Sequence, residues 1–186
     1  MKITTFKQLF GMTLTGVLTL AGAGVLAFEP AARADGRGIE GTWIARIRIV
    51  TCPPAPRVVL ASFQSMVTYL EGGTQVEGGA PPGPPPAVSR SSGHGIWERT
   101  GHNSFRTLNR FSSFDALGRL VSITTISNHT KLIHGDNPET PDVVEPYYLS
   151  GTATNEFTFF DPVDGSVTRV VEGCSESTNE PVLFDD

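Results

Sequence analysis

Residues 89–114 read SRSSGHGIWERTGHNSFRTLNRFSSF, and they contain the clearest structural pattern in the chain. A glycine-flanked histidine, His94, leads into a first arm at residues 95–100 that contains Trp97. Residues 101–103, GHN, turn the chain, and residues 103–114 continue as a second arm of alternating β-type side chains. Strand, tight turn and strand in this order predict a β-hairpin with a tryptophan on its first arm.

The segments on either side of this hairpin repeat the same two-residue alternation. In the first of them, Trp43, Ala45, Ile47 and Ile49 share one face, and two arginines lie on the other. We expect five further strands, at residues 41–50, 57–70, 119–134, 147–160 and 166–174. No stretch after residue 34 has a convincing 3.6-residue apolar period, so an all-β fold is predicted.

Seven or eight strands joined mostly by short turns form a meander, and a meander must protect its two edges. Closure removes both edges, which predicts an antiparallel up-and-down β-barrel of seven to eight strands. An open sandwich is the alternative. Residues 71–88 are rich in Gly and Pro and are expected to be an extended surface loop, and residues 175–186 an acidic tail.

The first 34 residues have the anatomy of a secretory signal peptide. Lys2 and Lys7 precede an apolar run at residues 9–25, and residues 32–34, ARA, fit a cleavage site of small residues. The run is short and interrupted for an uncleaved membrane anchor. Residues 35–186 then form a single domain with no membrane span after cleavage, and the protein is expected to be secreted or periplasmic.

The chain has two cysteines, Cys52 and Cys174. An oxidising compartment would allow them to pair. In a meander of seven strands, strands one and seven run the same way, so a cysteine at the end of each would lie at the same rim. This parity predicts a disulfide between Cys52 and Cys174.

Charge and motifs limit the classes of function. The formal net charge is −5, and the leader contributes +2, so the mature chain carries about −7, which argues against nucleic-acid binding. There is no HExxH, paired CxxC, His-x-His or Gly-x-Ser-x-Gly pattern, so no cofactor, metal or catalytic residue is predicted. A metal site assembled in space from the four histidines stays an alternative. For Glu98, a surface ion pair with Arg99 or Arg106 is favoured over a buried carboxylate.

Four short motifs mark the expected turns and strand starts: GTW at residues 41–43, HGIW at 94–97, FDALG at 114–118 and DPVDG at 161–165. Together they resemble exported bacterial lipocalin-like (calycin-type) β-barrel proteins, mostly without known function. The resemblance implies an eight-stranded barrel with an internal pocket and Trp43 packed across one end. It implies no particular ligand.

The predicted function is the binding of a small, largely apolar molecule inside the barrel. The candidate ligand-binding residues are Trp43, Ile47, Phe63, His94, Trp97, Phe105, Phe111 and Phe157. One alternative is a structural or interaction protein of the cell envelope, with the barrel filled by its own side chains. Another is an isomerase or cyclase, which would need an interior polar cluster around His94, Glu98 and an arginine.

Overall fold

A computed structural model describes residues 38–135, 137–138 and 147–183 of the chain. The predicted signal peptide at residues 1–34 lies outside these residues. All regular structure in the described part is β-strand. The strands are β1 (Gly41–Val50), β2 (Val59–Leu70), β3 (Thr74–Gly78), β4 (Ser89–Arg90), β5 (Gly93–Arg99), β6 (Ser104–Phe114), β7 (Leu120–His134), β8 (Tyr147–Phe160) and β9 (Val167–Pro181).

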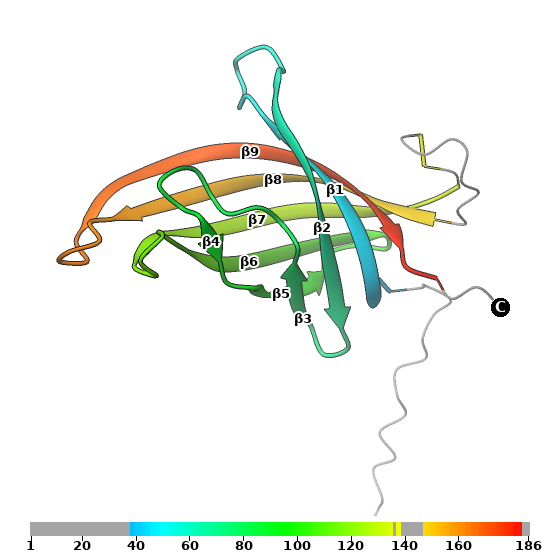
Figure 1. The fold of residues 1–186 in the computed structure, drawn as a ribbon. Helices are drawn as coiled ribbons and strands as arrows, with labels where there is room; N and C mark the ends of the chain where they lie inside the picture. The colour runs from blue at the N-terminus through cyan, green and yellow to red at the C-terminus, as the bar shows by residue number, and fades with distance from the viewer. Residues whose placement is uncertain (1–37, 136, 139–146, 184–186) are drawn as a thin grey trace, which may run out of the picture. The chain divides into compact units, whose positions relative to one another are not determined.

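Eight of these strands close into one antiparallel up-and-down barrel (Figure 1). The ring follows the chain from β1 through β2, β3, β5, β6, β7 and β8 to β9, and β9 pairs with β1 to complete it. The two-residue strand β4 pairs with the end of β6. The predicted all-β barrel is therefore confirmed with eight strands, and it is consistent with a lipocalin-like fold.

The expectation that residues 71–88 form a loop throughout is wrong, because Thr74–Gly78 is the strand β3. It lies between β2 and β5 and supplies the eighth member of the ring. Its inward side chains, Gln75 and Glu77, are polar and buried. Without an apolar residue on the inward face, the segment gives no strand signal beside its glycines and prolines.

The expectation of a tail at residues 175–186 also needs correction. Strand β9 runs on to Pro181, and its residues 174–181 pair with β1 to close the barrel. The predicted disulfide between Cys52 and Cys174 is confirmed, although the parity argument for it is wrong. Strand β9 runs antiparallel to β1, and Cys174 lies within β9, opposite Val50 at the end of β1.

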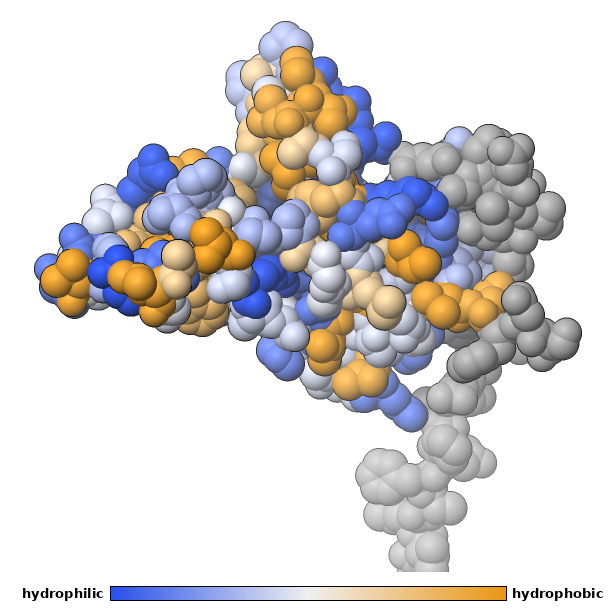
Figure 2. Space-filling model, viewed as in Figure 1, coloured by the Kyte–Doolittle hydropathy of each residue, from blue (hydrophilic) through white to orange (hydrophobic). Residues whose placement is uncertain are grey.

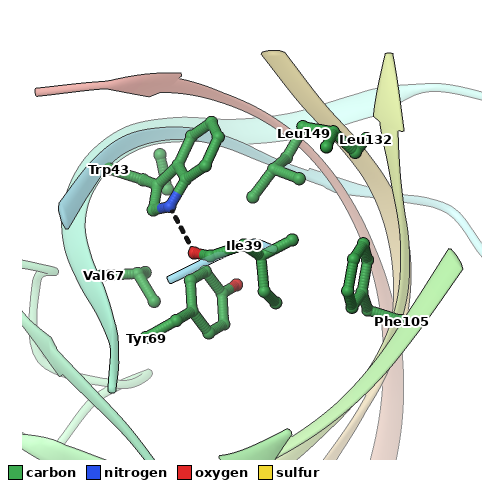
Figure 3. Close-up of a cluster of buried hydrophobic side chains, with 8 residues drawn as sticks. Ile39, Trp43, Val67, Tyr69, Phe105, Leu132 and Leu149 are labelled. Atoms are coloured by element: carbon green, nitrogen blue, oxygen red, sulfur yellow. Dashed lines mark hydrogen bonds between the residues drawn. The ribbon is translucent and has the colours of Figure 1, made fainter. Parts of the chain in front are cut away.

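One end of the barrel, which we call the closed end, is filled by a cluster of buried apolar side chains (Figure 3). Ile39 precedes β1 and lies in the middle of this cluster. The indole Nε1 of Trp43 donates a hydrogen bond to the carbonyl of Ile39 at 2.8 Å. This bond holds the segment before β1 across the closed end. The cluster consists of Ile39, Trp43, Ala45, Val67, Tyr69, Phe105, Leu132 and Leu149.

The strands separate at the other end, which we call the open end. Strands β1 and β9 pair only as far as Val50 and Cys174, and beyond this point the β1–β2 hairpin diverges from β8 and β9 (Figure 1). The projecting part of the β1–β2 hairpin presents an apolar surface (Figure 2), and its exposed apolar residues are Val58, Val59 and Leu60. In the described part of the chain, no helix is long and apolar enough to cross a membrane.

Candidate ligand-binding pocket

A cavity of about 580 Å³ occupies the open half of the barrel. Its volume is within the range of roughly 300–1,000 Å³ that is usual for small-molecule sites in proteins, so side chains leave the open half of the barrel unfilled. Most of the cavity wall is apolar. The apolar strand residues that line it are Ile47, Ile49, Ala61, Phe63, Phe111, Ile126, Ala153, Phe157, Phe159 and Val171.

The cavity wall follows from strand alternation. On β1 and β2, Ile47 lies opposite Phe63 and Ile49 lies opposite Ala61, so these neighbouring strands present one continuous apolar surface to the interior. On β8 the inward position between Gly151 and Asn155 is Ala153. Ala61 and Ala153 are small side chains at inward positions, and each leaves volume that a larger side chain would occupy.

The Pro-rich segment is part of the cavity wall. Residues 81–84, PPGP, line the cavity, and a Cβ at Gly83 would lie 3.3 Å from the hydroxyl of Ser113 on β6. The segment rejoins the sheet where the amide of Val88 donates to the carbonyl of Phe114. Proline rings add apolar surface without adding N–H groups that need partners. This segment was expected to be a surface loop, and its contribution to the pocket was not predicted.

A buried ion pair also lines the cavity, between Glu77 on β3 and Arg90 on β4. Arg90 Nη2 lies 2.7 Å from Glu77 Oε2, and the two side chains are 8% and 5% exposed. Ser65 and Asn109 also donate hydrogen bonds to the Glu77 carboxylate. The Arg90 guanidinium lies 3.6 Å from the ring centroid of Phe111, a favourable cation–π arrangement.

Sequence reasoning missed both members of this pair. Glu77 lies in the Gly- and Pro-rich segment, and Arg90 precedes the hairpin, so neither belongs to an alternating strand pattern. The charge of Glu77 has a small effect on a neighbouring group: burial in the first place, and this charge in the second, raise the pKa of the Tyr69 phenol above its ordinary value.

The structure brings together four of the eight predicted ligand-binding residues. Ile47, Phe63, Phe111 and Phe157 all line the cavity, and their role in binding stays a prediction. The other four lie elsewhere. Trp43, Trp97 and Phe105 pack in or against the closed-end cluster, and His94 is exposed on the outer face of β5.

The residues suggested for an enzyme do not converge in the interior. His94 and Glu98 are both exposed on the outer face of β5. Glu98 forms an ion pair with Arg106 at 2.7 Å, with side chains 59% and 57% exposed, so the predicted surface ion pair is confirmed with Arg106 as the partner. Among the residues that the structure describes, no three His, Cys, Asp or Glu side chains gather as a metal site would require.

No protein-family model and no curated protein matches the chain in sequence comparisons. The fold and the cavity define a closed, eight-stranded, antiparallel β-barrel with a largely apolar interior cavity at one end and a packed cluster at the other.

Proposed function

We propose that the protein is an exported lipocalin-like barrel that binds one small, largely apolar molecule in the cavity of its open half. The observation that carries this proposal is the 580 Å³ cavity with its apolar wall. Transfer of apolar ligand surface from water into such a wall is favourable by about 25 cal/mol per Å². The closed-end cluster gives the cavity a fixed floor, because its side chains are already packed against one another.

Export to an extracellular or periplasmic site is part of the same proposal. The disulfide between Cys52 and Cys174 supports it, because such bonds form and persist in oxidising compartments. The leader-like composition of residues 1–34 supports it independently. The acidic net charge of −5 argues against nucleic acid as a partner.

The contacts of Glu77, an acid that is buried in the cavity wall, favour binding over catalysis as the function. Glu77 accepts hydrogen bonds from Ser65 and Asn109 and pairs with Arg90. A carboxylate held in this way has most of its lone pairs engaged, whereas a general base needs a free one within reach of the substrate. We therefore assign Glu77 and its partners a structural role in the cavity wall.

The proposal is tested by filling the cavity from within. Ala153 faces the cavity on β8, and the adjacent Thr152 is exposed on the outer face. Ala153→Trp and Thr152→Trp therefore add the same side chain to opposite faces of one strand. Both variants and the wild-type chain are titrated with the neutral fluorescent probe N-phenyl-1-naphthylamine, and circular dichroism checks that each retains the β fold.

We expect saturable binding of one probe per chain, weakened at least about tenfold by Ala153→Trp and unchanged by Thr152→Trp. A tenfold change in affinity for the probe corresponds to about 1.4 kcal/mol of binding free energy, which is a modest loss for a variant whose cavity is filled. The absence of probe binding by the wild-type chain, or equal affinities of the two variants, would contradict the proposed function.

A further inference from the structure

Arg169 places a positive charge on the inward face of β9, at the open end of the barrel. Inward and outward side chains alternate along a strand, and Arg169 shares the inward face with Val171 and Ser175, which also line the cavity. Arg169 lies beyond Cys174, where the pairing of β9 with β1 ends. Because this arginine both lines the cavity and is exposed to water, it lies at the cavity mouth.

The aromatic ring of Phe159 supports Arg169 from the neighbouring strand. The two residues lie directly opposite each other on β8 and β9, and the guanidinium carbon lies 4.3 Å from the ring centroid. Phe159 is buried and also lines the cavity. A guanidinium is attracted to the face of an aromatic ring, and this stacking leaves the N–H groups at its edge available to an acceptor. Strand pairing and stacking therefore hold the cation beside the apolar cavity wall.

Within the part of the chain that the structure describes, Arg169 is the charged residue of the cavity wall that has no counter-charge. The charged residues that line the cavity are Glu77, Arg90, Arg169 and Glu176. Glu77 pairs with Arg90, and Glu176 Oε1 accepts a hydrogen bond from Arg57 Nε at 2.7 Å. These two pairs are neutral, so the described wall carries one uncompensated positive charge, at the mouth.

The charge at the mouth indicates which kind of polar group fits there. An uncompensated guanidinium favours an anionic head group, which it binds through charge-assisted hydrogen bonds. A carboxylate suits a single arginine, because its two oxygens match the planar N–H fork and its one charge needs one cation. A phosphate monoester carries about −1.5 to −2 at neutral pH, so part of its charge would stay unpaired. Since the mouth reaches water, a carboxylate there avoids the cost of full burial.

We propose that the ligand is an amphipathic carboxylate whose head group pairs with Arg169 at the cavity mouth. Its apolar body lies deeper in the cavity, against the apolar side chains of β1, β2 and β8. This inference rests on the proposed function, since it names the chemical class of the molecule that the cavity takes and a residue that selects it.

The test uses three probes of matched chain length, each below its micelle concentration: decanoate, 1-decanol and decyltrimethylammonium. They differ in the charge of the head group, which is negative, neutral and positive. Each probe competes with N-phenyl-1-naphthylamine for the wild-type chain and for two variants. Arg169→Gln removes the charge at the mouth. Arg110→Gln is the matched control, because it removes an exposed arginine from the outer face of β6.

In the wild-type chain we expect decanoate to bind about fivefold more tightly than 1-decanol, which is the upper range for an exposed ion pair. Decyltrimethylammonium should bind least tightly. Arg169→Gln should reduce the preference for decanoate over 1-decanol to within about twofold, and Arg110→Gln should keep it. Raising the salt concentration from about 20 mM to about 500 mM should also reduce this preference in the wild-type chain, because salt screens exposed charges.

The inference is overturned if the wild-type chain binds 1-decanol or decyltrimethylammonium at least as tightly as decanoate, or if salt leaves the preference for decanoate unchanged. It is also overturned if Arg169→Gln and Arg110→Gln show the same preference, since overall charge would then explain it. These results leave the proposed function intact. If none of the three displaces N-phenyl-1-naphthylamine, the inference falls, and the proposed function falls with it only if Ala153→Trp also leaves binding of that probe unchanged.

Discussion

Cys52 is bonded to Cys174 at the place where β1 and β9 part, with their Cα atoms 5.2 Å apart. Val50 and Cys174 are the last paired residues of these two strands. Beyond them the β1–β2 hairpin diverges from β8 and β9, and both pairs of strands contribute to the cavity wall. The disulfide therefore joins two parts of the open end that backbone hydrogen bonds no longer hold together.

Replacing both cysteines, in Cys52→Ser/Cys174→Ser, should destabilise the protein by up to about 4 kcal/mol, because the bond closes a long loop in the unfolded chain. The sequence separation of 122 residues places it near the upper end of such effects. Urea unfolding with and without reductant measures the loss. The double variant is the control, since reductant should not change its midpoint. A wild-type midpoint that is insensitive to complete reduction would contradict the prediction.

Two ion pairs of the same residue types allow a direct comparison of buried and exposed charge. Glu77→Gln leaves the Arg90 guanidinium buried without its counter-charge, and we expect a loss of about 3–5 kcal/mol of stability. Glu98→Gln breaks the exposed pair with Arg106 and should cost less than about 1 kcal/mol. The free energy of unfolding in urea measures both.

The double variant Glu77→Leu/Arg90→Leu separates an unpaired charge from a loss of packing. If the cost of Glu77→Gln arises from the uncompensated arginine, the double variant should be more stable than the single one. Equal costs for Glu77→Gln and Glu98→Gln would show instead that water reaches the Arg90 guanidinium.

Alternation along the chain was sufficient to predict the strands whose inward side chains are apolar. The predicted segments at residues 41–50, 103–114 and 147–160 correspond closely to β1, β6 and β8. Strand β3 and the closing half of β9 were missed because their inward residues are polar: Gln75 and Glu77 on β3, and Ser175, Ser177 and Asn179 on β9. A half-polar barrel interior removes the hydrophobic signal on which such predictions depend.

Four of the eight candidate ligand-binding residues line the cavity, and a related reason explains why the other four do not. Alternation shows which face a side chain occupies, and the inward face was correct for Trp43, Ile47 and Phe105. It does not show the height of a residue along the barrel axis. Trp43 and Phe105 therefore fill the closed end, whereas Ile47 reaches the cavity. The interior pair of Glu77 and Arg90 joins two segments that carry no strand pattern, so only the folded ring reveals it.

The glycines of the hairpin also have a structural role that can be tested. A Cβ at Gly95 would lie 2.0 Å from the backbone carbonyl oxygen of Leu108 on β6. Gly95→Ala should therefore destabilise the protein by about 3 kcal/mol, because the backbone of β5 or β6 must move. Gly78→Ala is the control, since a Cβ at Gly78 would meet no atom within 4 Å. It should be neutral or slightly stabilising. Similar urea midpoints for the two variants would mean that the strands adjust freely.

The turn between β6 and β7 should make stability depend on pH. Asp115 Oδ1 accepts hydrogen bonds from the amides of Leu117 and Arg119, and Oδ2 accepts one from Arg119 Nε. These bonds, chiefly the one from the Arg119 backbone amide, hold the pKa of Asp115 below its ordinary value of 3.8. A carboxyl whose pKa is lower in the folded state stabilises the fold above its unfolded pKa, and this contribution is lost as the pH falls through the lowered folded pKa.

The measurement for Asp115 is a ¹³C NMR titration of its side-chain carboxyl in the folded protein. We expect a midpoint below 3.8. Arg119→Ala should raise it only in part, because the two backbone amides still donate to Oδ1. In urea, Asp115→Asn should lose less stability than the wild-type chain between neutral and acidic pH, since it has no charge to neutralise. A midpoint at or above 3.8 would mean that the turn does not hold the carboxylate in solution as it does in this structure.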